Sequence, residues 1–271
     1  MKIGKKIDLI GAFTIINPTF TFIIIVLSFL VTPIHSQSFK YNQLKYQRVR
    51  EAYRDNYDLI DSTFQQKGVD INNMNIFLRA IKSERKLELY AKNNNDSNYT
   101  LIKSYDFCFF SGELGPKREE GDLQIPEGFY HIDRFNPSSY FFLSLGINYP
   151  NISDRKLATS RNVGGDIFIH GDCVSIGCIP LTDIWIKELY VICVEAKNNG
   201  QSKIPVHLFP FRMEDYSQNR LWYSTELRRL EFWDSLVDGY NYFEVQKQLP
   251  KVKANSYGVY TVEDYEPEIP Q

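Results

Sequence analysis

The sequence predicts a mostly β (α+β) fold, with strand-forming segments through the middle of the chain and a helix toward each end. Residues 42–66 carry apolar side chains at spacings of three and four, which is typical of a helix with one buried face. Residues 76–110 contain runs that alternate apolar and polar side chains between polar turns, as half-buried strands do. Residues 224–245 again have the helical spacing, so a second amphipathic helix is expected near the C-terminus.

The first expected helix, residues 42–66, has an apolar face and a charged face. The charged face is most simply a solvated surface, and Gly68 follows the helix as a stop signal. The apolar face consists of Val49, Ala52, Tyr53, Ile60 and Phe64.

The strand-forming segments begin with an antiparallel meander of three strands. A long loop at residues 111–128 is rich in glycine and charge, and its length indicates a functional surface. A short strand at residues 166–170 ends on a histidine. Thr182 is expected to cap a helix that runs to Tyr190, and Ser224 to cap the C-terminal helix. The other expected strands are residues 76–81, 86–91, 101–110, 129–134, 140–145, 190–196 and 206–211.

The first 36 residues have the order of an export signal. A lysine-rich start precedes an apolar run that is densest over residues 20–31, and small residues follow at Ser36 and Ser38. The unbroken run of about 12 residues is shorter than the roughly 20 that cross a bilayer. Cleavage near Ser36 or Ser38 is therefore favoured over an uncleaved membrane anchor, and no cysteine is present there for a lipoprotein anchor. Either way, the rest of the chain is expected to be exported to the periplasm or cell envelope.

The bulk composition allows a core of normal size, since 43% of the residues are hydrophobic and 15% are aromatic. Roughly 235 residues remain after an export segment, enough for one large domain. The formal net charge is −2, so no binding to nucleic acid and no electrostatic attachment to anionic membranes are expected. Contact with a membrane is expected only through an uncleaved N-terminal segment.

The chain has four cysteines, which in an exported protein allow two disulfides. A domain of this length does not need such crosslinks. Cys108 and Cys193 lie in apolar, strand-like runs, where buried free thiols are expected. Cys173 and Cys178 lie in a different setting, shortly after His170.

The segment from His170 to Cys178 has the residues of a cysteine nucleophile with its base. A thiol with a pKa of about 8.5 is mostly protonated at neutral pH. A nearby imidazole can take the proton, and the thiolate can then attack an amide carbonyl. Because Gly177 has no side chain, its N–H and that of Cys178 are candidate donors to an oxyanion. Ser175 is a candidate to orient the substrate or support the loop.

Two other interpretations of this segment stay open. His170, Asp172, Cys173 and Cys178 are zinc-ligand residue types, although a Cys-x4-Cys spacing with one histidine is a weak zinc signal. A local disulfide between Cys173 and Cys178 would disable the proposed nucleophile. Short motifs of this kind also occur by chance.

The segment resembles the active-site motif of the L,D-transpeptidase (YkuD) catalytic domain family, in its YafK-like branch. His170-Gly171 is similar to the first half of the motif, and residues 175–178 (Ser-Ile-Gly-Cys) are similar to the second. Ile176 stands where many members have histidine, and the gap between the halves is short; both departures resemble the YafK-like branch. The resemblance covers residues 75–211, and its other blocks are residues 115–117, 121–122, 126–130 and 148–151.

The resemblance implies a β-sandwich catalytic domain with the cysteine and histidine at one open end, and neither cofactor nor metal. It implies that Cys178 attacks the carbonyl of meso-diaminopimelate in a tetrapeptide stem of peptidoglycan and releases the terminal D-alanine. The acyl group then passes to an amine or to water. By the same resemblance His170 is the base, the carbonyl of Gly171 orients it, and Gly177 supplies an oxyanion N–H.

The acceptor of the acyl group is left open, because Ile176 removes a polar group near the thiol. The YafK-like branch includes hydrolytic members that detach proteins from the wall. A wall-attached protein is therefore a second expected partner beside the peptidoglycan stem peptides. An envelope binding protein without turnover and a zinc-dependent hydrolase are the competing hypotheses.

Five other residues are candidates for roles in the site. His131 and His207 are rival bases, but each lies in a strand-like run where a structural histidine is expected. Lys117, Arg134 and Arg155 are candidates to bind substrate carboxylates, because a fixed cation suits an anionic stem. Ordinary surface charge is an equally weighted interpretation of these three.

The predicted organisation has four parts. Residues 1–36 are a signal peptide or N-terminal membrane anchor, and residues 37–74 hold the N-terminal helix. Residues 75–211 form the L,D-transpeptidase-like (YkuD-like) catalytic domain. Residues 212–271 form a C-terminal helical extension with a polar, acidic tail.

Overall fold

The computed structural model describes residues 38–263. The predicted export signal or anchor and the last eight residues of the tail lie outside the described residues. Within residues 38–263, no helix is long and apolar enough to cross a membrane.

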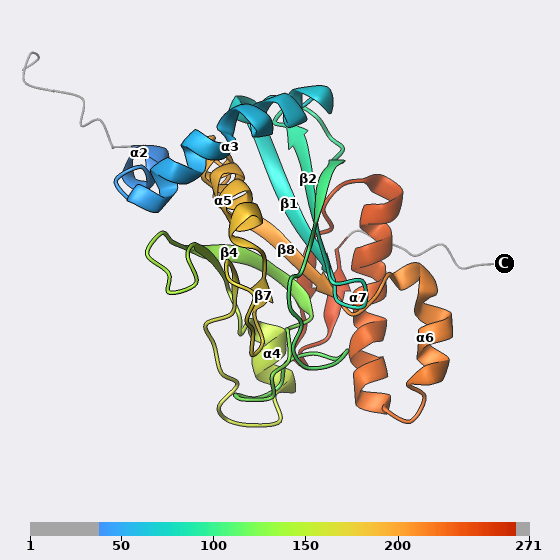
Figure 1. Ribbon diagram of the computed structural model, residues 1–271. Coiled ribbons are helices and arrows are strands. Elements are labelled where there is room, and N and C mark those ends of the chain that lie inside the picture. The colour runs from blue at the N-terminus through green and yellow to red at the C-terminus, as the bar shows by residue number, and fades with distance from the viewer. Residues whose placement is uncertain (1–37, 264–271) are drawn as a thin grey trace, which may run out of the picture. The chain divides into compact units, whose positions relative to one another are not determined.

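A mixed, twisted sheet of eight strands lies at the centre of the described chain (Figure 1). The strands are β1 (Met74–Ile81), β2 (Lys86–Asn93), β3 (Thr100–Asp106), β4 (Gly128–Asn136), β5 (Ser144–Ile147), β6 (Phe168–His170), β7 (Ile179–Pro180) and β8 (Ile204–Phe209). Their order in the sheet is β3-β2-β1-β8-β4-β5-β6-β7. β1 pairs with β8 and β6 with β7 in parallel, and the other neighbours pair antiparallel. The predicted meander of the first three strands is confirmed.

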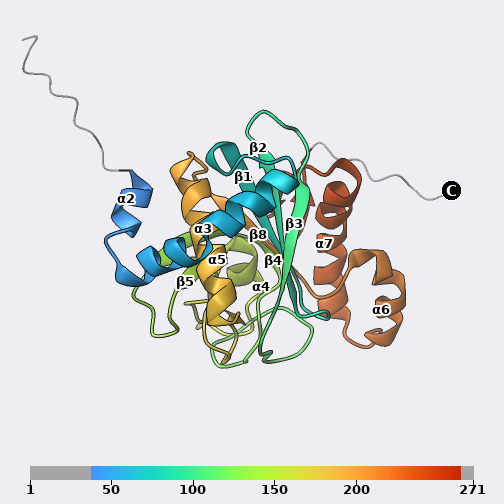
Figure 2. The same cartoon turned by 45° about the horizontal axis from the view of Figure 1, so that its top comes forward.

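Helices cover both faces of this sheet (Figure 2). Along β1, Ile76 and Leu78 belong to the core cluster on the side of α3 and α5, whereas Phe77 packs with α7 on the opposite side. The mixed α+β class with helices toward both ends is therefore confirmed. The helices are α2 (Phe39–Gln43), α3 (Gln47–Gln66), α4 (Ile152–Leu157), α5 (Asp183–Asn198), α6 (Tyr216–Trp222) and α7 (Leu227–Gln246), with 3-10 turns at Ile71–Asn73 and Met213–Asp215.

The predicted N-terminal helix forms as α2 and α3, separated by a short turn. The expected apolar stripe is confirmed in α3, where Val49, Ala52, Ile60 and Phe64 are buried and Tyr53 is half-buried. This face packs against α5. The 3.6-residue period was readable because the other face of α3 is solvated.

The strand predicted at residues 190–196 is wrong, because α5 continues through this segment to Asn198. The helix packs on the sheet on one side and on α2 and α3 on the other. A helix that is buried nearly all round lacks the polar face that marks a helix in a sequence. Its predicted N-cap is confirmed, since the Thr182 hydroxyl accepts the N–H of Trp185 at 3.4 Å.

Several predicted element ends also differ from the structure. β3 ends at Asp106, and β5 begins at Ser144, so that residues 140–143 form a turn instead of a strand. α7 begins at Leu227, and Ser224 does not cap it. In the expected polar tail, Val252–Ala254 (β9) and Tyr260–Val262 (β10) form an antiparallel hairpin.

Candidate active site

β6 and β7 bring the predicted nucleophile and base to one edge of the sheet. β6 ends on His170, and β7 begins directly after Cys178. The two strands pair in parallel with His170 opposite Pro180. This register places Cys178 beside Phe168, whose N–H points at the sulfur with an N···Sγ distance of 3.4 Å. The loop between the two strands therefore folds a sequence motif into one compact site.

The imidazole of His170 is held in one orientation. Its side chain is buried, and Nδ1 lies 2.5 Å from the carbonyl oxygen of Gly171. A carbonyl only accepts hydrogen bonds, so Nδ1 carries the proton and Nε2 holds the lone pair that a base needs. The ring of Phe141 packs against the imidazole with centroids 4.6 Å apart. Burial lowers the pKa of His170, which keeps the ring neutral at neutral pH.

Cys178 has a free and partly exposed thiol. Its Sγ lies 3.7 Å from the carbonyl oxygen of Asp166, and no hydrogen bond joins it to His170 in the described part of the chain. Burial raises the pKa of the Cys178 thiol. With this raised pKa and the lowered pKa of His170, the pair rests as thiol and neutral imidazole. Catalytic hydrogen bonds are often unformed in free enzymes and form when substrate binds.

Both predicted oxyanion donors are engaged within the loop. The Ser175 hydroxyl oxygen accepts the N–H of Gly177 at 3.1 Å and that of Cys178 at 2.8 Å, and it donates to the carbonyl of Cys178 at 2.8 Å. The two N–H groups thus converge on one oxygen atom, as oxyanion donors must. An acyl oxygen takes this position only after the Ser175 side chain turns away. Ser175 supports the loop in this state, which is the second of its two predicted roles.

Gly177 has backbone geometry that few other residues adopt. Its φ is +130°, and a Cβ added there would lie 3.0 Å from the carbonyl oxygen of Gln124. Glycine is therefore required both by the left-handed backbone and by the close approach of residue 124. The 111–128 loop thus forms one wall beside the nucleophile.

A disulfide anchors the loop that carries the nucleophile. Cys173 is bonded to Cys108, 65 residues earlier in the chain. The free buried thiol predicted at Cys108 is therefore wrong, and Cys173 does not pair with Cys178. Cys193 is a buried free thiol, as predicted. The N–H of Cys108 also donates to the carbonyl of Pro180 at 3.1 Å, so the segment after β3 contacts both the loop and β7.

Asp183 is a contributor that the sequence analysis missed. Its Oδ1 accepts the N–H of Asp172 at 2.9 Å. A Cβ added at Gly171 would lie 2.6 Å from the same oxygen, so Asp183 leaves no space for a side chain after the histidine. In the sequence, Asp183 looks like an ordinary acidic residue in the first turn of a helix, where it favours the helix dipole.

Lys117, the first candidate substrate cation, lies near the thiol but already has partners. It is buried, and its Nζ donates to Asp122 at 2.7 Å and to the carbonyl of Glu119 at 2.9 Å. Its positive charge acts against the rise in the pKa of Cys178. A substrate carboxylate would therefore share Lys117 with Asp122.

Arg134 and Arg155 differ in their surroundings. Arg134 pairs with Asp166 at 2.7 Å, and its guanidinium lies over the ring of Phe168 at 4.8 Å, beside the nucleophile. Arg155 is exposed on α4, and within residues 38–263 its side chain makes no hydrogen bond or ion pair. Arg134 thus borders the thiol, whereas Arg155 faces a groove farther along the surface.

The rival histidines lie on other strands. His207 on β8 is packed between Phe77 and Phe129, with centroids 4.6 and 4.8 Å away, and burial lowers its pKa to about 3. His131 on β4 is half-buried, and burial also lowers its pKa.

Among the described residues, no group of three or more His, Cys, Asp or Glu side chains is placed to hold a metal ion. The sulfur of Cys173 is already bonded to Cys108.

The fold and the loop between β6 and β7 agree with one protein family. The family model of the L,D-transpeptidase catalytic domain (YkuD) matches residues 69–207, a segment that runs from just before β1 into β8 and contains both His170 and Cys178. The chain belongs to this family. α6, α7 and the β9–β10 hairpin lie beyond the matched segment.

A relative from Escherichia coli carries the name of the YafK-like branch. The chain is 38% identical over 179 residues to the Escherichia coli (strain K12) protein named "Putative L,D-transpeptidase YafK", which covers 65% of this chain and 70% of that protein. A solved structure, the helical cell shape determining protein Pgp2 from Campylobacter jejuni, is 18% identical with a TM-score of 0.41 and covers 67% of this chain and 73% of that chain. Bd1075 from Bdellovibrio bacteriovorus is 21% identical with a TM-score of 0.35, over 62% and 60% of the two chains.

Proposed function

We propose that the protein is a peptidoglycan L,D-transpeptidase-like cysteine enzyme that forms an acyl-enzyme on Cys178 with a diaminopimelate-containing stem peptide. The observation that carries the proposal is the tautomer of His170. Its Nδ1–H donates to the carbonyl of Gly171, which leaves Nε2 free as a base. The partly exposed thiol of Cys178 lies directly before the neighbouring strand, β7. Family membership supports the wall peptide as substrate class.

The proposed reaction begins from a neutral thiol. As Sγ attacks the carbonyl carbon of diaminopimelate, Nε2 of His170 takes the thiol proton. The tetrahedral intermediate collapses, the carbon–nitrogen bond breaks, and the amine of the leaving D-alanine takes the proton from His170. An incoming amine or water then attacks the thioester carbon and passes a proton to Nε2 of His170. The carbon–sulfur bond breaks, and His170 returns the proton to Sγ, which restores the thiol.

The N–H groups of Gly177 and Cys178 are the proposed oxyanion donors. In the structure, both donate to one oxygen atom, the hydroxyl of Ser175. The proposal requires the acyl oxygen to replace this hydroxyl during attack. Preorganised N–H donors stabilise the charge that develops on the acyl oxygen.

A hydrolase that detaches protein from the wall is the second candidate function, and the position of Ile176 favours it. Ile176 is 79% exposed at the tip of the loop, two residues before the nucleophile. An isoleucine side chain has no group that can hydrogen-bond an incoming amine, so water is a more favoured acceptor than it would be beside a polar residue. A non-catalytic envelope binding protein is the third candidate, and the free base at His170 argues against it. An envelope location, periplasmic or wall-facing, is proposed with all three.

Mass spectrometry of muropeptides incubated with the protein tests the function. New 3→3 links indicate transpeptidation, shortened stems indicate hydrolysis, and release of wall-bound protein indicates the detaching activity. Cys178→Ala is expected to lower product formation at least about a thousandfold. The matched control is Cys193→Ala, which removes the buried free thiol of α5 and is expected to keep activity. Full activity in Cys178→Ala would overturn the proposal.

A further inference from the structure

Two adjoining grooves lie on the side of the 111–128 loop that faces α4 and α7. The larger, of about 1080 Å³, lies between residues 115–124, the C-terminal end of α4 and the first half of α7. The smaller, of about 680 Å³, is lined by residues 150–164. Ala158 and Thr159 line both, and the two adjoining grooves are here together called the basic groove.

Positive charge gathers along the basic groove although the whole chain has a net charge of −2. Two carboxylates, Glu226 and Glu231, line it, and Glu226 is paired with an arginine. Four of the cations, Arg155, Lys156, Arg161 and Arg228, are exposed, and in the described chain their side chains have no hydrogen bond or ion pair. The full set of lining cations is Arg118, Arg155, Lys156, Arg161, Arg228 and Arg229.

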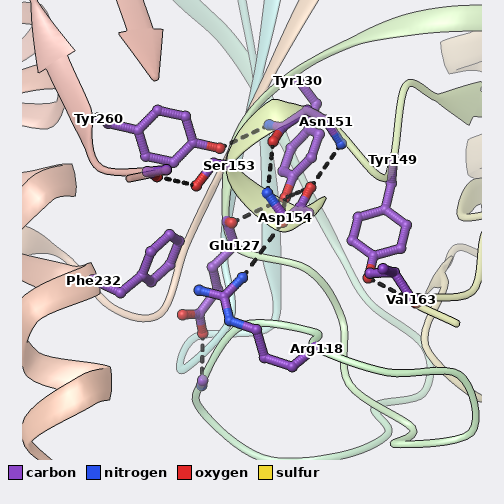
Figure 3. Close-up of polar contacts among 12 residues, drawn as sticks. Arg118, Glu127, Tyr130, Tyr149, Asn151, Ser153, Asp154, Val163, Phe232 and Tyr260 are labelled. Carbon is purple, nitrogen blue, oxygen red and sulfur yellow. Dashed lines mark hydrogen bonds and ion pairs between the residues drawn. The ribbon is translucent and has the colours of Figure 1, made fainter. Parts of the chain in front are cut away.

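Arg118 is fixed in the wall of the basic groove with hydrogen-bonding capacity to spare. Figure 3 shows its guanidinium between the ring of Phe232 and the carboxyl group of Asp154. The guanidinium carbon lies 4.5 Å from the Phe232 ring centroid, and Nη1 lies 3.6 Å from Asp154, too far for a hydrogen bond. Nη1 is buried and has no hydrogen-bond partner among the described residues. A guanidinium has five donors that suit carboxylates in a two-pronged geometry.

The basic groove and the loop that carries Cys178 both contact the 111–128 loop, although neither Cys178 nor His170 lines the groove. Gln124 lines the groove, and the carbonyl of the same residue lies against Gly177. Gly164 lines its other end, and a Cβ there would lie 3.5 Å from the side chain of Lys117, the lysine whose charge acts on Cys178. A polymer long enough to pass over the 111–128 loop can therefore present one stem to Cys178 and another to the groove.

We propose that the basic groove binds carboxylate-bearing peptide stems of the wall polymer that are not the reacting stem, and so retains the enzyme on the polymer. The proposal rests on the proposed function, which makes that polymer the substrate. Peptide stems carry several free carboxylates, the ligands that unpaired arginines bind best. Residues 225–235 and Val259 in the lining lie beyond the segment matched by the family model, so the groove depends on the C-terminal extension of this chain.

Co-sedimentation with insoluble peptidoglycan sacculi tests the groove. The Cys178→Ala protein is used as the background, so that catalysis does not alter the polymer. Reversing two exposed groove charges, Arg161→Glu with Arg228→Glu, is expected to weaken binding about tenfold. The matched control reverses two exposed lysines away from the groove, Lys67→Glu with Lys203→Glu, and is expected to bind like the background.

A second arm needs no variant in the groove. Sacculi whose carboxylates have been converted to amides are expected to lose binding by a similar factor, since the positive groove then has no charged partner. The proposal would be overturned if the two groove substitutions and the two control substitutions weakened sacculus binding equally. Unchanged binding of amidated sacculi would also overturn it. Binding to phosphatidylglycerol vesicles that needs Arg161 and Arg228, without binding to sacculi, would overturn it in favour of a lipid surface.

The test of the basic groove and the test of the proposed function can fail independently of each other. With Cys178 intact, the Arg161→Glu, Arg228→Glu double variant is expected to turn over small soluble stem peptides at a rate within about twofold of that of the unmodified protein, because such peptides do not reach the groove. A failure of the proposed chemistry would appear as activity that survives Cys178→Ala. The sacculus-binding result does not depend on that assay.

Discussion

One hydrogen bond determines which nitrogen of His170 is free for the proposed role as base. The carbonyl oxygen of Gly171 accepts Nδ1–H, with an Nδ1···O distance of 2.5 Å. Burial lowers the pKa of His170 and so keeps the ring neutral. Burial raises the pKa of Cys178 at the same site. Both shifts disfavour a resting thiolate–imidazolium pair, so the proton moves during attack and not before it.

We predict that Cys178 reacts slowly with iodoacetamide at neutral pH. Burial raises its pKa above the ordinary thiol value, so the alkylation rate should be low at neutral pH and should keep rising with pH past the point at which an ordinary thiol levels off. Cys193 is buried and should not react in the folded protein, so the rate reports Cys178. A fast rate that is constant from about pH 5 to 8 would indicate a preformed ion pair and would contradict the prediction.

Ser175 is predicted to support acylation by holding the backbone of the nucleophile. Ser175→Ala removes three hydrogen bonds to residues 177–178 and is expected to slow acylation about tenfold. Ser175→Thr keeps the hydroxyl and should recover most of the rate. Ser111→Ala is the control, because in the described chain the Ser111 hydroxyl has one hydrogen-bond partner, the Ser175 hydroxyl at 3.3 Å, and bonds to neither Gly177 nor Cys178. Faster acylation in Ser175→Ala would show that the hydroxyl obstructs the oxyanion donors instead.

At the scale of elements, the β6–β7 loop is held by a crosslink as well as by hydrogen bonds. The Cys108–Cys173 disulfide joins it to the segment after β3, and Asp183 at the start of α5 holds the N–H of Asp172. A disulfide that closes a loop of this length restricts the unfolded chain and contributes about 4 kcal/mol to the free energy of unfolding.

We predict that Cys108→Ser with Cys173→Ser lowers the free energy of unfolding by several kcal/mol, up to the roughly 4 kcal/mol of loop entropy. Urea unfolding in the Cys178→Ala background measures it without side reactions of the nucleophile. Adding a reductant should shift the midpoint of the background protein and leave the double variant unchanged. Equal midpoints for the two oxidised proteins would contradict the prediction.

Glu127, in the 111–128 loop, forms a buried ion pair with Lys82 and a hydrogen bond with the C-terminal helix α7. Lys82 donates to Glu127 at 2.9 Å and to the carbonyls of Gly115 and Ile125, and both charged side chains are fully buried. The second carboxylate oxygen of Glu127 accepts Nε1–H of Trp233 in α7 at 2.7 Å. The extension beyond the family segment thereby contacts the loop that forms one wall of the site.

Trp233→Phe is predicted to destabilise the protein by about 2 kcal/mol, because it leaves a buried carboxylate oxygen without its donor. The same variant should speed amide hydrogen exchange in residues 111–125, which Glu127 anchors through the N–H of Gly115. Trp222→Phe is the matched control, since Trp222 is 85% exposed and should change stability by less than about 0.5 kcal/mol. Unchanged exchange in Trp233→Phe would contradict the link between the helix and the loop.

The sequence predicted those elements whose pattern is local. The stripe of α3 was readable because one face is solvated, and the strand ending on His170 was marked by an apolar run before a polar motif. The second half of α5 was misread as a strand because both of its flanks are covered. The Cys108–Cys173 pairing and the role of Asp183 were not predictable, since each depends on segments that meet only in the folded chain.

At the scale of the whole described chain, the site lies on two short strands at one edge of a sheet whose faces are covered by helices. α3 and α5 pack on one face and α7 on the other, and the largest core cluster extends to Ile169 and Ile179, directly beside His170 and Cys178. The edge position leaves the β6–β7 loop accessible to a polymer. In our proposal this edge carries the chemistry on one stem, while the basic groove, which the C-terminal extension helps to line, binds other stems of the same polymer.

The central claim is that Cys178 carries the acyl group, and intact-protein mass spectrometry tests it most directly. The protein is mixed with a stem tetrapeptide and quenched in acid within the first turnover. The predicted result is a protein heavier by the tripeptide acyl group, with the added mass on the peptide that contains Cys178 and no adduct in Cys178→Ala. Product formation without any adduct, or an adduct that persists in Cys178→Ala, would contradict the claim.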